Sequence, residues 1–161
     1  LQAFCDSYGV TLQHMKLHGA FYNTACVTPA LADAVLDGLQ AVNPNIAAMV
    51  LSGSYIAKEA ERRGIPVIQE VFADRGYTDE GTLVPRTEPG AFIKDPQEAL
   101  ERVLMMVTEG KVVTNTGNTI DIVADSVCVR GDNPEAIAFT NYIREGLTKA
   151  GVTVANFQNR K

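Results

Sequence analysis

The sequence predicts an α/β protein with parallel strands and crossover helices. Short apolar runs of strand length alternate with longer segments in which apolar residues recur at helical spacing. Short connectors join these segments, and this strand–helix–strand alternation is typical of a parallel sheet. An open doubly wound sheet and a (β/α) barrel both fit the pattern. A complete eight-fold barrel typically needs about 250 residues, so these 161 residues could form most of a barrel without its first units.

The first half of the chain contains clear strand and helix signals. The residues up to Gly9 resemble the end of a helix, with that glycine as its C-terminal cap. Pro29 suits the first turn of a helix, and Gly64 is a natural helix stop. The predicted strands are Leu12–Leu17, Ile46–Leu51 and Val67–Val71, and the predicted helices are Pro29–Val42 and Ser54–Arg63.

The second half adds two predicted helices on either side of a hairpin. Asp95 and Glu98 have the spacing of a capping box and precede an apolar stripe that runs to Val107. An Asn-Thr-Gly-Asn turn joins two short runs into a predicted hairpin. The hairpin strands are Lys111–Thr114 and Thr119–Ala124, the next strand is Val127–Arg130, the last helix is Pro134–Ala150, and a final strand is Val152–Ala155.

The composition predicts a single soluble α/β domain over residues 1–161. Apolar residues make up 46% of the chain and charged residues 20%, as in ordinary globular proteins. A net charge of −5 with no basic run argues against a nucleic-acid partner. No apolar run approaches the roughly 20 residues of a membrane span. The cysteines are scattered and odd in number, which favours free thiols in a reducing compartment, and without a signal peptide we expect a cytoplasmic protein.

The stretch from Glu70 to Arg86 is the strongest candidate for a functional loop. It follows a buried strand and turns polar at once, and loops at the C-terminal ends of strands line the active face of α/β proteins. Regular loops between a strand and a helix have about 2–6 residues, and longer ordered ones are usually functional. The apolar residues interleaved with the charges are expected to dock the loop, whereas the alternative is a solvated surface loop. They are Phe72, Tyr77, Leu83 and Val84.

Within this loop, the charged residues suit both chemistry and binding. Glu70 and Asp74 form the best acid/base pair of the chain. Arg75 and Arg86 suit bidentate binding of a carboxylate or phosphate. Structural ion pairing within the loop could use the same residues, so the two interpretations stay open at this point.

Polar groups also follow the first predicted strand. On a strand, His14, Lys16 and His18 point to one face. A Lys beside a His at a strand end could bind an anion or polarise a carbonyl, and a surface Lys with a capped His fits equally well. Because the segment is predicted as a strand, the His14–His18 spacing does not indicate a helical metal pair, and the sequence predicts no metal ligands.

Two further strand ends carry polar residues with structural interpretations. Ser54 is expected to cap the following helix, which is favoured over a role for the Ser-Gly-Ser turn in binding a carboxylate. Asp132 or Asn133 could cap the last helix in the same way. Cys128 is expected in the core and not as a nucleophile.

Together, several of these segments resemble the LamB/YcsF family, the A subunits of prokaryotic-type 5-oxoprolinase, also called lactam utilisation proteins. The resemblance covers nearly the whole chain but only the later part of the family's chain, because the family's opening motifs, DLNxDxGE and Cys-Gly-x-His-Ala-Gly-Asp, are absent. This agrees with a first residue other than Met, and we expect a preceding segment. The matching motifs are MKLHGAFYN at 15–23, EVFADRGY at 70–77, DEGTLVPR at 79–86, Gly90–Ala91 and VCVRGDNPEA at 127–136.

The resemblance implies an incomplete deacetylase-like (β/α) barrel. It also implies a role in the ATP-dependent opening of 5-oxo-L-proline, a lactam, to L-glutamate, together with separate B and C subunits. Since the sequence has no P-loop, ATP would be bound with the help of partner subunits or of a segment outside this sequence, and a metal requirement stays open. The alternatives are a metal-dependent amide or sugar deacetylase and a non-catalytic fragment or scaffold subunit.

The resemblance also assigns roles to individual residues. Lys16 and His18 match the family's KPHGALYN, the run from Glu70 to Arg75 matches EVFADR, Arg86 follows the LVP segment, and Asp132 matches the Asp of a His-Gly-Asp motif. The expected catalytic residues are Lys16, His18, Glu70 and Asp74, and the expected substrate-binding residues are Arg75, Arg86 and Asp132.

Two residues depart from the family pattern. Leu17 replaces the usual Pro, which should relax the backbone between Lys16 and His18. Arg130 replaces the usual His before Gly-Asp, and Arg is not a usable acid or base near neutral pH. A barrel without its first units would also leave the strand at Leu12–Leu17 as an open edge, so a homo-oligomer that covers this edge is possible.

Overall fold

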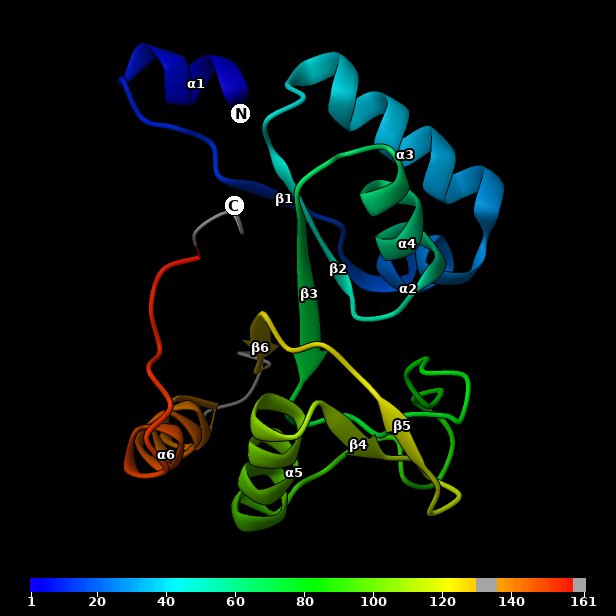
Figure 1. Cartoon of the computed structure of the whole chain (residues 1–161), viewed down its shortest axis with the longest axis vertical. Helices are drawn as coiled ribbons and strands as arrows, with labels where there is room; N and C mark the ends of the chain where they lie inside the picture. The colour runs from blue at the N-terminus through cyan, green and yellow to red at the C-terminus, as the bar shows by residue number, and fades with distance from the viewer. Residues whose placement is uncertain (130–135, 158–161) are drawn as a thin grey trace. The chain divides into compact units, whose positions relative to one another are not determined.

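The computed structural model describes residues 1–129 and 136–157 of the chain (Figure 1). It divides into two compact units, Leu1–Ile68 and Gln69–Lys161. The four-stranded sheet has the order β1-β2-β3-β6. Strand β3 belongs to both units, since its first two residues end the first unit and the rest begin the second. The single domain expected from chain length stays a prediction.

The first unit consists of parallel strands and the helices that connect them. Strands β1 and β2 pair in parallel, with His14 opposite Ala47, and the backbone N–H of Ala48 donates to Pro66 O just before β3, at 2.8 Å. The predicted strands and helices of this unit are confirmed, with β1 shorter than expected. The elements are α1 (Gln2–Ser7), β1 (His14–Lys16), α2 (Gly19–Val27), α3 (Pro29–Val42), β2 (Ala47–Leu51), α4 (Tyr55–Arg62) and β3 (Val67–Phe72).

Helix α2 is an element that the sequence pattern did not predict. Its residues, GAFYNTACV, include aromatic and β-branched side chains, which are weak helix formers, and they show no clear polar face. Packing decides instead, because Tyr22, Ala25 and Cys26 are buried within the first unit. Tertiary contacts therefore override local propensity in this helix.

An ion cluster joins α3 to α4. The guanidinium of Arg63 contacts Asp33 at 2.7 Å, Asp37 at 2.6 Å and Glu59 at 2.6 Å. Arg62 also bonds to Glu59, and hydrogen bonds from the two guanidinium groups lower the pKa of Glu59 to about 2. The pairs with an exposed partner, Arg62–Glu59, Arg63–Asp33 and Arg63–Asp37, contribute little one by one, whereas the Arg63–Glu59 pair is largely buried. The cluster links the end of α4 to α3.

The second unit combines the end of β3 with two helices and a hairpin. Strands β3 and β6 pair in parallel, with Glu70 opposite Ser126, and β4 pairs antiparallel with β5 as predicted. Asp95 caps α5 by accepting from the N–H of Glu98 at 3.1 Å. The elements are α5 (Pro96–Thr108), β4 (Lys111–Val113), β5 (Thr119–Asp121), β6 (Ser126–Cys128) and α6 (Ala136–Lys149).

Helices α5 and α6 pack on each other over an apolar core that contains Ala73, Val103 and Leu147. The predicted final strand at Val152–Ala155 is wrong, because these residues form no strand. Val152 instead packs against the α5–α6 core, so its apolar side chain is half-buried without sheet pairing.

Two further expectations concern the cysteines and the membrane. Cys5, Cys26 and Cys128 form no disulfide bonds among the described residues, in line with the prediction of reduced thiols. Among the described residues, no single helix has the length and apolar composition to cross a membrane. Helices α2 and α3 together reach that length and composition, but the chain bends by 112° between them.

Candidate active site

The two carboxylates predicted as an acid/base pair are both buried. Glu70 lies in β3 and is 2% exposed, and Asp74 follows two residues after the strand and is 9% exposed. Both residues have at least one interaction partner, as expected for carboxylates that are largely removed from water. The backbone carbonyl of Asp74 also accepts from the N–H of Ile93 at 3.0 Å. The second unit therefore places two carboxyl groups at the end of one strand, on an ordered backbone.

Arg75 connects the two ends of the loop that follows. Its Nε donates to the carbonyl of Ala91 at 2.9 Å, and one Nη donates to the carbonyl of Val84 at 2.6 Å. The guanidinium carbon lies 5.1 Å from the centroid of the Phe92 ring, and the residue is 4% exposed. These contacts give Arg75 a structural task. Its predicted role in binding a substrate carboxylate stays a prediction.

Tyr77 folds back onto the strand that carries Glu70. Its side chain is fully buried, and its hydroxyl accepts a hydrogen bond from the backbone N–H of Phe72 at 2.9 Å. Burial raises the pKa of the Tyr77 hydroxyl well above its ordinary value, and the charge of Glu70 acts in the same direction. The hydroxyl therefore stays neutral and fixes the last residue of β3.

Asp79 attaches the same loop to the β4–β5 hairpin. Its carboxylate accepts from the hydroxyls of Thr114 and Thr116 at 2.5 and 2.7 Å, and from the Asn118 amide at 3.0 Å. These hydrogen bonds lower the pKa of Asp79. Gly76 allows another close approach, because a Cβ there would collide with the carbonyl oxygen of Gly90.

The expectation that apolar side chains dock the loop is confirmed. Phe72, Tyr77 and Val84 are buried, and Leu83 is half-buried. The loop is therefore an ordered part of the second unit. This excludes the alternative of a solvated surface loop.

The other predicted binding residues differ in accessibility. Arg86 is exposed, so its guanidinium is open to a ligand from solution. Asp132 and Arg130 lie outside the described residues. Their predicted roles stay predictions.

Lys16 and His18 belong to the first unit. Lys16 ends β1, and its Nζ lies 5.6 Å from the centroid of the Tyr22 ring, at the outer range of a cation–π contact. His18 is exposed and has the extended backbone of an N-cap residue, with φ −125° and ψ 153°, directly before α2. The sequence analysis expects Lys16 and His18 to act together with Glu70 and Asp74. The first two residues belong to the first unit and the other two to the second unit, and their joint action stays a prediction.

The Ser-Gly-Ser turn has the structural role that was favoured for it. The hydroxyl of Ser54 accepts from the N–H of Ala57 at 3.4 Å and donates to the carbonyl of Leu51 at 2.6 Å. It therefore caps α4, as predicted.

Arg102 on α5 is a half-buried cation that the sequence pattern did not single out. One Nη donates to the carbonyl of Val113 at 3.2 Å, whereas Nε and the other Nη have no hydrogen-bond partner among the described residues. Burial lowers the pKa of Arg102, and the charge of Glu98 opposes this. In the sequence, the residue resembles any charged position of an amphipathic helix, so no signal could have identified it.

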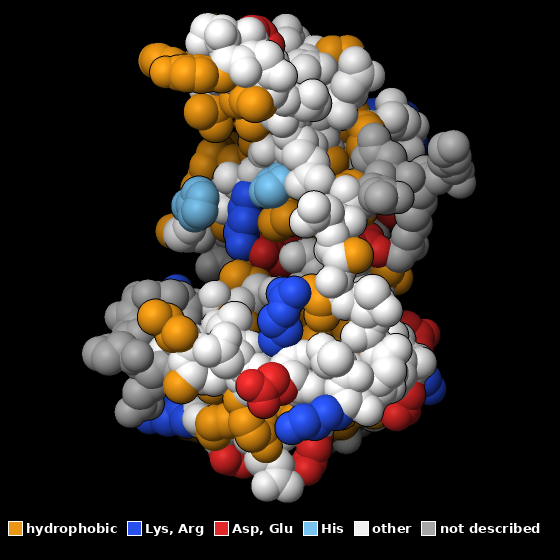
Figure 2. Space-filling view, turned by 90° about the vertical axis from the view of Figure 1, so that its left-hand side faces the viewer, with side chains coloured by type: hydrophobic (Ala, Val, Ile, Leu, Met, Phe, Trp, Pro, Cys, Tyr) orange, Lys and Arg blue, Asp and Glu red, His pale blue; other side chains and the backbone are white. Residues whose placement is uncertain are grey.

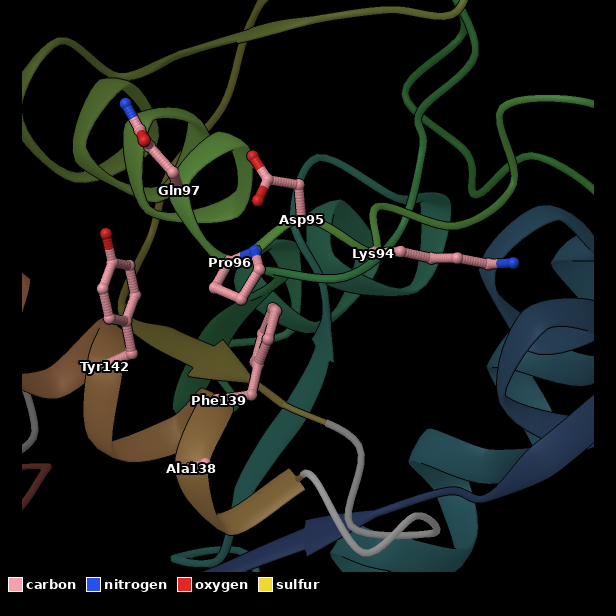
Figure 3. A pocket seen from close by; sticks show the side chains of 7 residues that line it. All are labelled: Lys94, Asp95, Pro96, Gln97, Ala138, Phe139 and Tyr142. Carbon is pink, nitrogen blue, oxygen red and sulfur yellow. The ribbon is translucent and has the colours of Figure 1, made fainter.

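A groove of about 570 Å³ lies between the start of α5 and α6 (Figure 3). Phe139 points toward Pro96, while the Lys94 side chain extends away from the other labelled groups. No residue predicted for catalysis or binding lines it. The lining residues are Lys94, Asp95, Pro96, Gln97, Ala138, Phe139 and Tyr142.

Parallel strands joined by crossover helices, with buried carboxylates at a strand end, define a protein of the α/β class. Comparison with known proteins gives the particular family. The sequence profile of the LamB/YcsF family matches residues 1–161, and the chain belongs to this family. The crystal structure of the lactam utilization protein from Thermus thermophilus is similar, with a TM-score of 0.86 and 38% identity over 97% of this chain and 62% of that one. This confirms the predicted incomplete (β/α) barrel.

Relatives of known name are also similar in sequence. The 5-oxoprolinase A subunit of Fusobacterium nucleatum is 56% identical over 154 residues, which are 96% of this chain and 60% of the relative. The 5-oxoprolinase A subunit of Pyrococcus abyssi is 46% identical over 154 residues, again 96% of this chain and 60% of the relative. The chain therefore spans about three fifths of the length of these relatives.

Proposed function

We propose that the protein serves as the A subunit of an ATP-dependent 5-oxoprolinase, which opens 5-oxo-L-proline to L-glutamate. The observation that carries the proposal is the 56% identity over 154 residues to a protein named as the A subunit of 5-oxoprolinase. The buried carboxylates Glu70 and Asp74, on an ordered loop, support a hydrolytic role for this part of the chain.

The reaction sets clear requirements for the site. A lactam is a stable amide, so its carbonyl must be activated before water adds to it. The oxygen of water then bonds to the carbonyl carbon, the C–N bond breaks, and the ring nitrogen takes up a proton. Such a reaction uses a general base for the water, an acid for the leaving nitrogen and a positive group for the developing oxyanion.

Residues of this chain suit each of these tasks. In our proposal, Glu70 or Asp74 exchanges protons together with His18, and Lys16 stabilises the negative charge on the carbonyl oxygen. Exposed Arg86 binds the substrate carboxylate, and Asp132 contributes to substrate binding. Because the guanidinium of Arg75 already donates to two backbone carbonyls, its main contribution is to hold the loop in place.

Partner subunits complete the proposal. The relatives are named as one subunit of 5-oxoprolinase, which indicates an enzyme with several subunits, and we propose that the partners are the B and C subunits. ATP supplies the activation of the carbonyl, and because the sequence has no P-loop, the partners contribute to its binding. We place this assembly in the cytoplasm.

A chimera tests the proposal. This chain would replace the matching 154 residues of the Fusobacterium nucleatum relative, and glutamate release from 5-oxoproline would be measured with that relative's partner subunits, with and without ATP. We expect ATP-dependent release that falls at least about a hundredfold in a Glu70→Gln chimera, as for loss of a general acid or base.

The exposed Glu88→Gln change is the matched control and should leave the rate unchanged. A folded chimera that binds the partner subunits but releases no glutamate would refute the proposal. Release that needs a divalent metal and no ATP would favour the deacetylase-like alternative instead.

A further inference from the structure

The connection between β1 and α2 brings a lysine and a tyrosine together. Strand β1 ends at Lys16, and α2 begins at Gly19. Gly19 has a φ of 60°, a left-handed conformation that side chains disfavour, so the chain can turn sharply from the strand into the helix. Tyr22 lies one turn into α2, and the centroid of its ring is 5.6 Å from the Nζ atom of Lys16. The turn therefore places an aromatic ring beside the last side chain of the strand.

The Tyr22 residue is held firmly in the first unit. It is 5% exposed. Its backbone N–H donates to the carbonyl of His18 at 3.4 Å, and its own carbonyl accepts from the thiol of Cys26 at 3.1 Å. Helix α2 packs against both α3 and α4, so its buried face is fixed from two sides. The ring is therefore a rigid support, whereas Lys16 carries its charge on a flexible four-carbon stem.

The strand end of this contact is open to solution. His18 is exposed and Lys16 is half-buried, whereas Tyr22 is buried. Figure 2 shows both histidine side chains of the chain (pale blue) on one face of the molecule, with a basic side chain (blue) between them. A ligand at this face can reach the groups at the end of β1. Tyr22 is too buried to bind it directly, so any effect of the ring on chemistry has to act through Lys16.

An aromatic face is well suited to holding a catalytic ammonium group. Its π-system attracts a cation over distances up to about 6 Å. Unlike a carboxylate, the ring does not neutralise the charge, which therefore stays available for a developing oxyanion. Charge of this kind is most effective when it is already in place before the reaction. Lys16 has further interactions besides this one, so the ring is one of several restraints.

We propose that Tyr22 is a positioning residue for Lys16 in the opening of the lactam. The ring restricts the lysine side chain and keeps its ammonium group where the carbonyl oxygen of the substrate becomes negative. An aromatic side chain at position 22 is then needed for more than core packing. The catalytic task of Lys16 rests on the proposed function, whereas the contact between the ring and the ammonium group does not.

A graded series of rings at position 22 tests this role. Phe, monofluoro-Phe and trifluoro-Phe have nearly the same shape, but fluorine withdraws electron density and weakens the attraction of the ring face for a cation. The assay is glutamate release by the chimera with the Fusobacterium nucleatum relative. We expect Tyr22→Phe to keep kcat within about twofold, and fluorination to lower it stepwise, by about three- to thirtyfold in total, with KM nearly unchanged.

Side-chain relaxation measured by NMR tests the contact without any activity. The probe is the 161-residue chain labelled at the lysine ε-carbons, and the order parameter of Lys16 is compared across the ring series. With Tyr or Phe at position 22, it should exceed that of the exposed Lys58, and it should fall with fluorination. The same rings at position 55 are the matched control and should change neither kcat nor this order parameter, because Tyr55 contacts no cation through its ring among the described residues.

Two results would overturn the proposal. One is an order parameter of Lys16 that is the same for every ring, and the other is an active chimera whose kcat is the same for every ring. An order parameter that falls with fluorination, in combination with a chimera that is inactive even with Tyr at position 22, would refute the proposed function and still support the hold of the ring on Lys16. Equal thermal unfolding across the series shows that no result reflects misfolding.

Discussion

Replacing Tyr77 by Phe removes one atom from the candidate loop and tests how this loop is held. The hydroxyl of Tyr77 accepts from the N–H of Phe72 at 2.9 Å, and the ring is fully buried. Phe keeps the ring packing but removes the hydroxyl that accepts this hydrogen bond. A hydrogen bond of this kind contributes about 0.5–1.5 kcal/mol net, and each kcal/mol corresponds to about 2–4 °C in Tm for a chain of this size.

The measurement is the free energy of unfolding from urea titrations of the wild-type chain and the Tyr77→Phe variant. Tyr55→Phe is the matched control, because this tyrosine is 37% exposed and its hydroxyl makes no hydrogen bond among the described residues. The control should change stability by less than about 0.5 kcal/mol. A Tyr77→Phe variant as stable as the control would show that the hydroxyl does not anchor β3.

The raised pKa of Tyr77 adds an independent alkaline test of the burial of its hydroxyl. The ordinary pKa is 10.0, and burial raises it in the folded state. Below pH 10 both states keep the proton, so the contribution is constant. Above pH 10 only the unfolded state loses the proton, and the stability of the wild type falls by up to about 1.4 kcal/mol per pH unit. The stability difference between wild type and Tyr77→Phe should therefore narrow above pH 10.

Three other substitutions test the remaining loop contacts. Arg75→Met should lower the free energy of unfolding by about 2–4 kcal/mol, since two buried carbonyls lose a charged donor, and limited proteolysis should then cut between residues 76 and 91. Gly76→Ala should give little folded protein by circular dichroism, because its Cβ meets the backbone of Gly90. In the wild type, the lowered pKa of Asp79 stabilises the folded state above pH 3.8, and this stabilisation is lost as the pH falls through the pKa of the folded state. Asp79→Asn should remove this pH-dependent stabilisation. Urea unfolding of both proteins at pH 2 and pH 6 tests this, and an equal difference at both values would contradict it.

Local signals predicted most of the fold. The capping residues Ser54 and Asp95 and the apolar stripe of α3 act within a few residues of the chain, so their effect can be inferred from sequence. Helix α2 could not be inferred, because its residues are weak helix formers and its stability comes from packing within the first unit. The false strand at Val152–Ala155 has the opposite cause, since its β-branched residues resemble a strand but pair with no strand in residues 1–129 and 136–157.

The candidate site shows where sequence reasoning reaches its limit. The position and polar character of Glu70 and Asp74 could be inferred from the end of a buried strand. The tasks of Arg75 and Tyr77 could not, because their partners lie 16 and 5 residues away in sequence and are backbone groups of the loop and strand. A backbone carbonyl leaves no signal in the identity of its residue. An arginine at position 75 is therefore equally compatible with binding a ligand and with fixing a loop.

The contacts of Arg75 help to distinguish between a structural and a catalytic loop. Apolar side chains such as Val84 already dock the loop, and burying a guanidinium beside them costs desolvation energy that a purely structural loop could avoid. Side-chain hydrogen bonds hold Arg75, directly after Asp74, and Phe72, two residues before it. Catalytic groups need such support, because a carboxylate that shifts by about 1 Å loses much of its effect on a reaction. This cost is understandable if the loop must hold Asp74 in one position, and it favours a chemical role for the second unit over a scaffold role.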